Sequence, residues 1–91
     1  MRYVIAYDIE NDKRRKKVAD ILEGYGVRVN YSVFEVDLPQ SKILKLLSEI
    51  KKVVSLKKDS VRFYHISTPS LKKSFEVCNR GEVFEGIGGF V

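Results

Sequence analysis

The side chain best suited to chemistry is Asp8, a carboxylate that follows a run of apolar residues. Its position supports two interpretations. In one, Asp8 caps the helix predicted to follow it or pairs with a neighbouring arginine. In the other, it is a ligand for Mg²⁺, a cation that accepts oxygen ligands, keeps several waters and often needs only one or two carboxylates. A homodimer would supply the second carboxylate from its own Asp8 where the two-fold axis passes nearby.

Basic residues follow Asp8 in the sequence KRRKK that begins at Lys13. Arg14 and Arg15 fall in the first turns of the predicted helix, close to Asp8. Guanidinium groups bind phosphates through paired hydrogen bonds, which an ammonium group does less well. We therefore expect Arg14 and Arg15 to hold phosphates, whereas Lys13 and Lys16 belong to a solvated helix face.

The charge balance of the chain favours a polyanionic partner. Lysine and arginine number 17 against 12 aspartate and glutamate residues, which gives a formal net charge of +5. The same basic surface would also serve solubility. Ser32 has two interpretations, contact with a phosphate or a hydrogen bond to its own backbone. Further positive surface for a nucleic-acid backbone comes from Lys17, Arg28, Lys57, Lys58, Lys72 and Lys73.

Other residue types narrow the choice of function. His65 is the single histidine, so a histidine-based metal site or a Ser-His-Asp triad lacks the necessary parts. Cys78 is the single cysteine and indicates a reducing compartment. The first apolar run is too short for a signal peptide or a membrane span, so we expect a cytoplasmic protein with no membrane contact. Four strand aromatics either stack on bases or belong to the core: Tyr7, Tyr31, Phe34 and Tyr64.

Hydrophobic periodicity predicts the elements that position these residues. Residues 2–9 are nearly all apolar, which is typical of a central strand covered on both faces. Asn11 or Asp12 then caps a helix. We expect Gly24 and Gly26 to end this helix in the left-handed region of backbone space. The apolar face of the helix consists of Val18, Ile21, Leu22 and Tyr25.

The second half of the predicted fold begins with an irregular strand. Apolar alternation changes phase between residues 27 and 38, which predicts a bulge or tight bend near Ser32 and Val33, hence a kinked strand or two short strands. A second helix opens near Pro39, with Ser41 as its cap. A last strand covers residues 61–66 and ends at the sequence TPS. The second helix presents the apolar residues Ile43, Leu46, Leu47, Ile50 and Val54.

This order of elements predicts one α+β domain, a ferredoxin-like sandwich with two helices on one face of an antiparallel sheet. Residues 1–68 would form the core and residues 69–91 a tail for dimerisation and partner binding. The bare sheet face predicts a homodimer. We expect the tail segment from Phe75 to Phe84 to cross to the partner subunit as an exchanged strand, and the glycine-rich end from Gly86 to dock on another protein.

Together these residues resemble the CRISPR-associated family called Cas-Two. The resemblance covers roughly residues 2 to 66. Its parts are Tyr7-Asp8-Ile9, the basic helix through Arg15 and Val18, Leu22, Tyr25-Gly26, Ser32-Val33-Phe34-Glu35 and the strand segment DSVRFY that begins at Asp59.

The resemblance implies a homodimer that works with the Cas-One integrase in acquiring CRISPR spacers. It also implies a metal-dependent endonuclease that acts on single-stranded RNA or double-stranded DNA, with two Asp8 carboxylates holding one Mg²⁺ or Mn²⁺. In this interpretation Arg15 and Arg28 position the backbone, and Tyr7 and Phe34 shape the cleft. Lys17 stands where some family members have arginine.

Two further interpretations remain open at the level of sequence. In the first, the dimer is a non-catalytic adaptor that holds a DNA duplex between integrase copies, and Asp8 is structural. One acidic residue per subunit is a small catalytic set, which favours this alternative. In the second, the chain is an unrelated ferredoxin-like RNA-binding domain, against which the motif around Asp8 argues.

Overall fold

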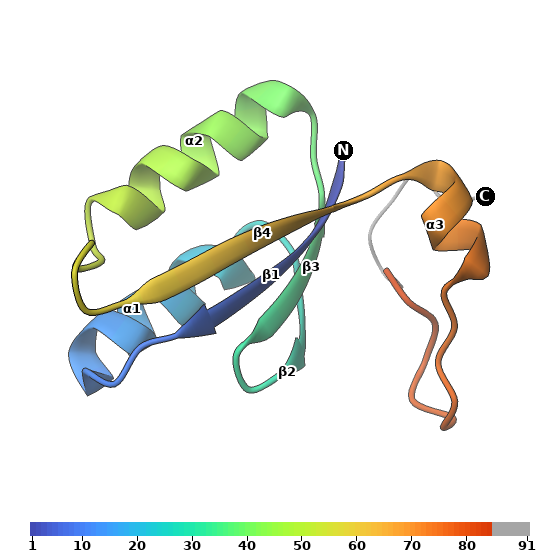
Figure 1. Cartoon of the computed structure of the whole chain (residues 1–91), viewed down its shortest axis with the longest axis horizontal. Coiled ribbons are helices and arrows are strands. Elements are labelled where there is room, and N and C mark those ends of the chain that lie inside the picture. Colours follow the sequence, from blue (N-terminus) through green and yellow to red (C-terminus); the bar gives the residue numbers. More distant parts are fainter. Residues whose placement is uncertain (85–91) are drawn as a thin grey trace.

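A computed structural model describes residues 1–84 of the chain. Its antiparallel sheet has the strand order β2-β3-β1-β4, and helices α1 and α2 cover one face (Figure 1). The predicted α+β, ferredoxin-like sandwich is confirmed. The strands are β1 (Arg2–Asp8), β2 (Val27–Asn30), β3 (Val33–Asp37) and β4 (Ser60–Ile66), and the helices are α1 (Asp12–Glu23), α2 (Gln40–Lys51) and the short α3 (Thr68–Lys73).

Strand β1 occupies the centre of the sheet, as its sequence predicts. It pairs antiparallel with β3 on one side and β4 on the other. Ile5 and Tyr7 are buried in the core, whereas Val4 and Ala6 alternate with them and are only half-buried. The two long helices therefore cover one face of β1 and leave the other face open, so the cover predicted for both faces is not found within the described chain.

Helix α1 begins and packs as the sequence predicts. Asn11 is its N-cap, and the Asn11 side chain accepts a hydrogen bond from the Arg14 backbone N–H at 2.9 Å. Val18 and Leu22 are fully buried, and Ile21 packs against the same core. This capped start fixes the direction in which the basic residues of the first turns leave the helix.

The glycines after α1 do not adopt the predicted left-handed conformation. Gly24 has a φ of −76° and stays right-handed, and Gly26 is not among the positive-φ residues of the described chain. Gly26 is instead required by space, because a Cβ atom there would lie 2.3 Å from the Glu35 carbonyl oxygen and 2.5 Å from Val36 Cγ1. The missing side chain lets the start of β2 lie against β3.

The irregular segment forms two short strands, and the tight bend predicted near Ser32 is confirmed. Tyr31 and Ser32 form a tight turn between β2 and β3, and a separate register shift lies between Arg28 and Asn30. The turn needs neither glycine nor proline, because the Asn30 side-chain oxygen accepts a hydrogen bond from the Tyr31 backbone N–H at 2.8 Å.

Helix α2 starts differently from the prediction. Its N-cap is Pro39, no side chain caps it, and Ser41 lies inside the first turn. The prediction of Ser41 as the cap was therefore wrong. The Pro39 carbonyl accepts hydrogen bonds from the backbone N–H groups of Lys42 and Ile43, which starts the helix two residues earlier. The predicted apolar face is confirmed at its centre, where Leu46 is fully buried.

The chain after β4 departs from the prediction. The sequence TPS opens α3 instead of only ending the strand, and the Ser67 side chain caps this helix. Residues 74–84 contain no strand in this single chain, so the strand predicted within Phe75–Phe84 is absent from it. Strand exchange needs a second copy and stays a prediction, as does the division of the chain at residue 68. The glycine-rich end from Gly86 lies outside the described residues.

Candidate functional site

Asp8 ends the central strand on the open face of the sheet. It pairs with Ser60, the first residue of β4, and it is exposed. Side chains alternate along a strand, so Asp8 points away from Tyr7 and shares its face with Ala6 and Val4. The sequence-predicted metal ligand is therefore an accessible carboxylate at the edge of an uncovered surface.

A single chain supplies few candidate metal ligands near Asp8. Among residues 1–84, no three or more histidine, cysteine, aspartate or glutamate side chains gather closely enough to hold a metal ion. Mg²⁺ tolerates this, because it binds through one or two carboxylates and fills its remaining positions with water. The donor set fits Mg²⁺ or Mn²⁺ at Asp8 once a second carboxylate comes from another copy.

Arg28 is fixed by its neighbours while it stays accessible. Its Nε and Nη2 atoms donate to the Tyr31 carbonyl oxygen at 3.1 and 2.6 Å, and Nη2 lies 3.3 Å from the Tyr7 hydroxyl. Its guanidinium carbon lies 5.6 Å from the ring centroid of Phe34. Nη1 lies 3.6 Å from a carboxylate oxygen of Glu23, and 42% of the Arg28 side chain is exposed. The arrangement presents a pre-oriented cation at the edge of the sheet.

Tyr7 and Phe34 support Arg28 from inside the core. Their rings are stacked with centroids 6.3 Å apart, and the Tyr7 hydroxyl donates to the Tyr31 carbonyl oxygen at 3.0 Å. Tyr7 is 5% exposed and Phe34 is fully buried. Both rings therefore act on the site through packing, and a direct contact with substrate would require the core to open.

Arg28 and Asp8 lie on opposite faces of the sheet. Arg28 pairs with Phe34 across β2 and β3 and shares its face, whereas Asp8 lies on the open face. The two residues nevertheless lie at the same end of the sheet. The Tyr7 backbone N–H donates to the Ser32 carbonyl oxygen at 3.0 Å, so the end of β1 that carries Asp8 lies beside the turn between β2 and β3. Ser32 is half-buried in the turn at this end.

Arg15 anchors the loop that follows Asp8. Its Nη1 donates to the carbonyl oxygens of Ile9 and Glu10 at 3.0 and 3.1 Å, and its Nη2 pairs with the Asp12 carboxylate. The Arg15 side chain is 44% exposed, so it retains surface for a phosphate. Lys17 is exposed on the same helix.

Arg14 is committed to an ion pair that sequence reasoning missed. Its Nε and Nη2 donate to the two carboxylate oxygens of Asp59 at 2.7 and 3.1 Å. The Asp59 side chain is only 2% exposed. The hydrogen bond from Arg14, with a second from the Ser55 backbone N–H, lowers the pKa of Asp59 below its ordinary value. Arg14 is placed here to hold the loop before β4, which leaves Arg15 and Arg28 as the accessible arginines among those predicted to hold phosphates.

Glu35 is a second carboxylate that the sequence reasoning did not single out. It is 8% exposed, and its Oε1 atom accepts a hydrogen bond from the Phe84 backbone N–H at 2.6 Å. Burial raises its pKa, and the hydrogen bond from Phe84 opposes that shift. Alternation with the core residues Phe34 and Val36 places Glu35 on the other face of the sheet, so the sequence carried no signal of its burial. Glu35 joins the tail of the chain to β3.

The fold and site define a small α+β protein with an exposed strand-end carboxylate and a fixed arginine at one end of its sheet. The family model for CRISPR associated protein Cas2 matches residues 1–74. A Synechocystis protein named CRISPR-associated endoribonuclease Cas2 3 is 55% identical over 69 residues, which are 76% of this chain and 75% of that protein. A Thermus thermophilus protein named CRISPR-associated endonuclease Cas2 2 is 38% identical over 65 residues, 71% of this chain and 72% of that protein.

Solved structures agree with these relatives. Streptococcus pyogenes Cas2 at pH 6.5 matches with a TM-score of 0.75 at 25% identity, over 86% of this chain and 100% of that one. A chain of a partial Cas6-RT-Cas1–Cas2 complex matches with a TM-score of 0.78 at 29% identity, over 99% of this chain and 97% of that one. The chain belongs to the CRISPR-associated Cas2 (Cas-Two) family. Within the described residues, no helix is long and apolar enough to cross a membrane.

Proposed function

We propose that this chain works in CRISPR spacer acquisition as a homodimeric, metal-dependent endonuclease of single-stranded RNA, double-stranded DNA or both. The observation that carries the proposal is Asp8, an exposed carboxylate at the end of the central strand on the uncovered sheet face. The names of the Synechocystis and Thermus relatives, an endoribonuclease and an endonuclease, support the reaction class. The single cysteine supports a cytoplasmic location.

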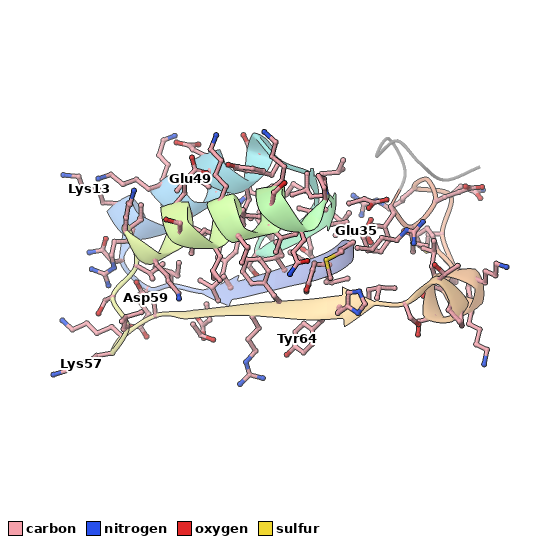
Figure 2. All side chains as sticks on the ribbon, turned by 90° about the horizontal axis from the view of Figure 1, so that it is seen from above. Lys13, Glu35, Glu49, Lys57, Asp59 and Tyr64 are labelled. Carbon is pink, nitrogen blue, oxygen red and sulfur yellow. The ribbon has the colours of Figure 1, made fainter. Side chains whose placement is uncertain are left out.

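The open face of the sheet supports a homodimer. Val4 and Tyr64 pair across β1 and β4 on the same face as Asp8, and Tyr64 is 48% exposed. Figure 2 shows Tyr64 projecting from β4 away from the helices. A second copy packed on this face about a two-fold axis would cover these side chains and bring two Asp8 carboxylates together.

The roles of the residues follow from their positions. Two Asp8 carboxylates would hold one Mg²⁺ or Mn²⁺, and such a metal lowers the pKa of bound water and polarises a phosphate. Arg15, which donates to the carbonyl oxygen of Ile9, the residue after Asp8, would hold a phosphate near the cleaved bond. Arg28 would hold a neighbouring phosphate at the sheet edge, because Tyr7 and Phe34 fix its guanidinium beforehand.

The integrase Cas1 is the protein partner we propose. The structural match to a chain of the partial Cas6-RT-Cas1–Cas2 complex covers 99% of this chain. The two chains are therefore alike also in the described residues beyond β4. A specific observation also favours a second function, that of a non-catalytic DNA-binding adaptor between integrase copies. Asp8 is an exposed carboxylate on the open sheet face of the single chain. A second copy packed tightly over that face would hide Asp8 from a nucleic acid, which would leave binding without cleavage.

Cleavage assays decide between these two functions. Labelled single-stranded RNA and duplex DNA are incubated with wild-type protein, Asp8→Asn and the control Glu10→Gln, which removes another exposed carboxylate two residues away. We expect Mg²⁺-dependent cleavage by wild type and Glu10→Gln, and cleavage by Asp8→Asn no greater than with EDTA. Undiminished cleavage by Asp8→Asn would remove Asp8 from the reaction. Binding without cleavage by all three proteins would favour the adaptor.

A further inference from the structure

The loop between α2 and β4 is braced from inside. The buried Asp59 carboxylate accepts hydrogen bonds from Arg14 of α1 and, at 2.8 Å, from the Ser55 backbone N–H. The Asp59 backbone N–H donates in return to the Ser55 carbonyl oxygen at 3.0 Å. A further hydrogen bond within the loop runs from the Lys58 backbone N–H to Ser55 Oγ at 3.3 Å. These contacts make a closed turn that is tied to helix α1.

The braced turn presents lysines to solvent. Lys57 and Lys58 are exposed, whereas the acidic residue that follows them is buried and already paired with Arg14. Figure 2 shows Lys57 and Lys13 projecting from the same end of the molecule as Asp59. Because Asp59 is buried and paired with Arg14, the outward charges of the turn itself are those of Lys57 and Lys58.

The position of the turn relates it to Asp8. Strand β4 begins at Ser60, immediately after the turn, and Ser60 pairs directly with Asp8. Lys57 and Lys58 therefore lie only three and two residues before Ser60, the residue that pairs with Asp8. A nucleic-acid backbone that passes over Asp8 and continues off the end of the sheet reaches these lysines next.

We propose that Lys57, Lys58 and Lys13 form a phosphate-binding surface, the lysine end, that holds the nucleic-acid backbone beside Asp8, with the Arg14–Asp59 pair as its positioning brace. The proposal rests on the proposed function in one respect, that the ligand is a nucleic acid. Lysine suits this role because it binds phosphates as a point charge and carries no requirement for sequence. The arginine of the brace contributes by fixing the loop and makes no phosphate contact of its own.

Salt-dependent binding tests the lysine end. Labelled single-stranded RNA and duplex DNA are titrated with protein from about 50 to 200 mM salt, the range over which phosphate contacts change affinity most visibly. Lys57→Ala/Lys58→Ala is compared with Lys42→Ala/Lys45→Ala, which removes the same charge from the exposed face of α2. We expect the slope of log K against log salt to fall by about 1.4 to 1.8 for the first variant and to stay unchanged for the second.

Equal slopes in both double variants would overturn the proposal. The outcome is independent of catalysis, because binding is measured without Mg²⁺, so a protein that binds but does not cleave leaves the result intact. Asp59→Asn tests the brace separately. Removing a negative charge should strengthen binding to a polyanion if charge alone matters, whereas a loosened loop should weaken it. Tighter binding by a folded Asp59→Asn protein would contradict the brace.

Discussion

Gly26 tests whether the site depends on the close packing of β2 against β3. In Gly26→Ala the new Cβ atom would lie 2.3 Å from the Glu35 carbonyl oxygen, and real Cβ contacts essentially never fall below 3.0 Å. The backbone must therefore separate by at least 0.7 Å, the difference between those two distances. Glu35 cannot yield freely, because it lies in β3 between its register partners Val4 and Val27.

The expected cost combines two effects. Overpacking costs about 1–3 kcal/mol, and a weakened ladder hydrogen bond adds about 1 kcal/mol. We expect a loss of about 3 kcal/mol, which lowers Tm by more than about 10 °C in a domain of this size. Because β2 carries Arg28, nucleic-acid binding should weaken in the same variant.

Gly24→Ala is the matched control for this measurement. Gly24 is right-handed at a φ of −76°, and a Cβ atom there meets only the Ile21 carbonyl oxygen at 3.3 Å. Alanine also restricts the unfolded chain, so we expect a change within about 1 kcal/mol of wild type. Thermal melts at one fixed protein concentration compare the three proteins, since dimerisation makes Tm depend on concentration. A Gly26→Ala protein as stable as Gly24→Ala would refute the reasoning.

Three further predictions concern the tail, Glu35 and the brace. Truncation after Thr68 should convert dimer to monomer or aggregate in light scattering, and a truncated protein that stays dimeric at micromolar concentration would rule out strand exchange as the link. Burial raises the pKa of Glu35, so the folded chain holds this proton to a higher pH than the unfolded chain, and its contribution to stability falls as pH rises above its ordinary pKa. Glu35→Gln should remove that fall in melts between about pH 4 and 7, and identical pH profiles for both proteins would contradict it. The pKa of Asp59 is lowered, so its contribution is present at neutral pH and is lost as pH falls through the folded value; Asp59→Asn should melt lower than wild type at pH 7 with a smaller difference in acid.

Local patterns in the sequence predict most of the fold. Alternation and apolar runs place β1 and its terminal Asp8, and the 3.6-residue period places Val18 and Leu22 in the core of α1. These features depend on neighbours in the chain. The Asn30 turn could also have been predicted, since an asparagine side chain stabilises a turn without glycine or proline.

The features that the sequence did not predict depend on contacts between distant residues. Arg14 and Asp59 are 45 positions apart, and only the folded chain shows that they neutralise each other. Arg28 and Asp8 read as one site in sequence, yet strand pairing puts them on opposite faces of the sheet. The reason for Gly26 is a close approach to Glu35, a residue nine positions later in another strand.

The central claim is that two Asp8 carboxylates from two subunits share one metal ion. Wild-type and Asp8→Asn subunits are unfolded together, refolded in equal amounts and assayed for Mg²⁺-dependent cleavage at constant total protein. If both carboxylates are needed, random pairing in a two-fold dimer leaves about one quarter of the wild-type activity, since about one dimer in four carries two Asp8 side chains. An activity of about one half would show that each Asp8 acts alone, and would contradict the shared site.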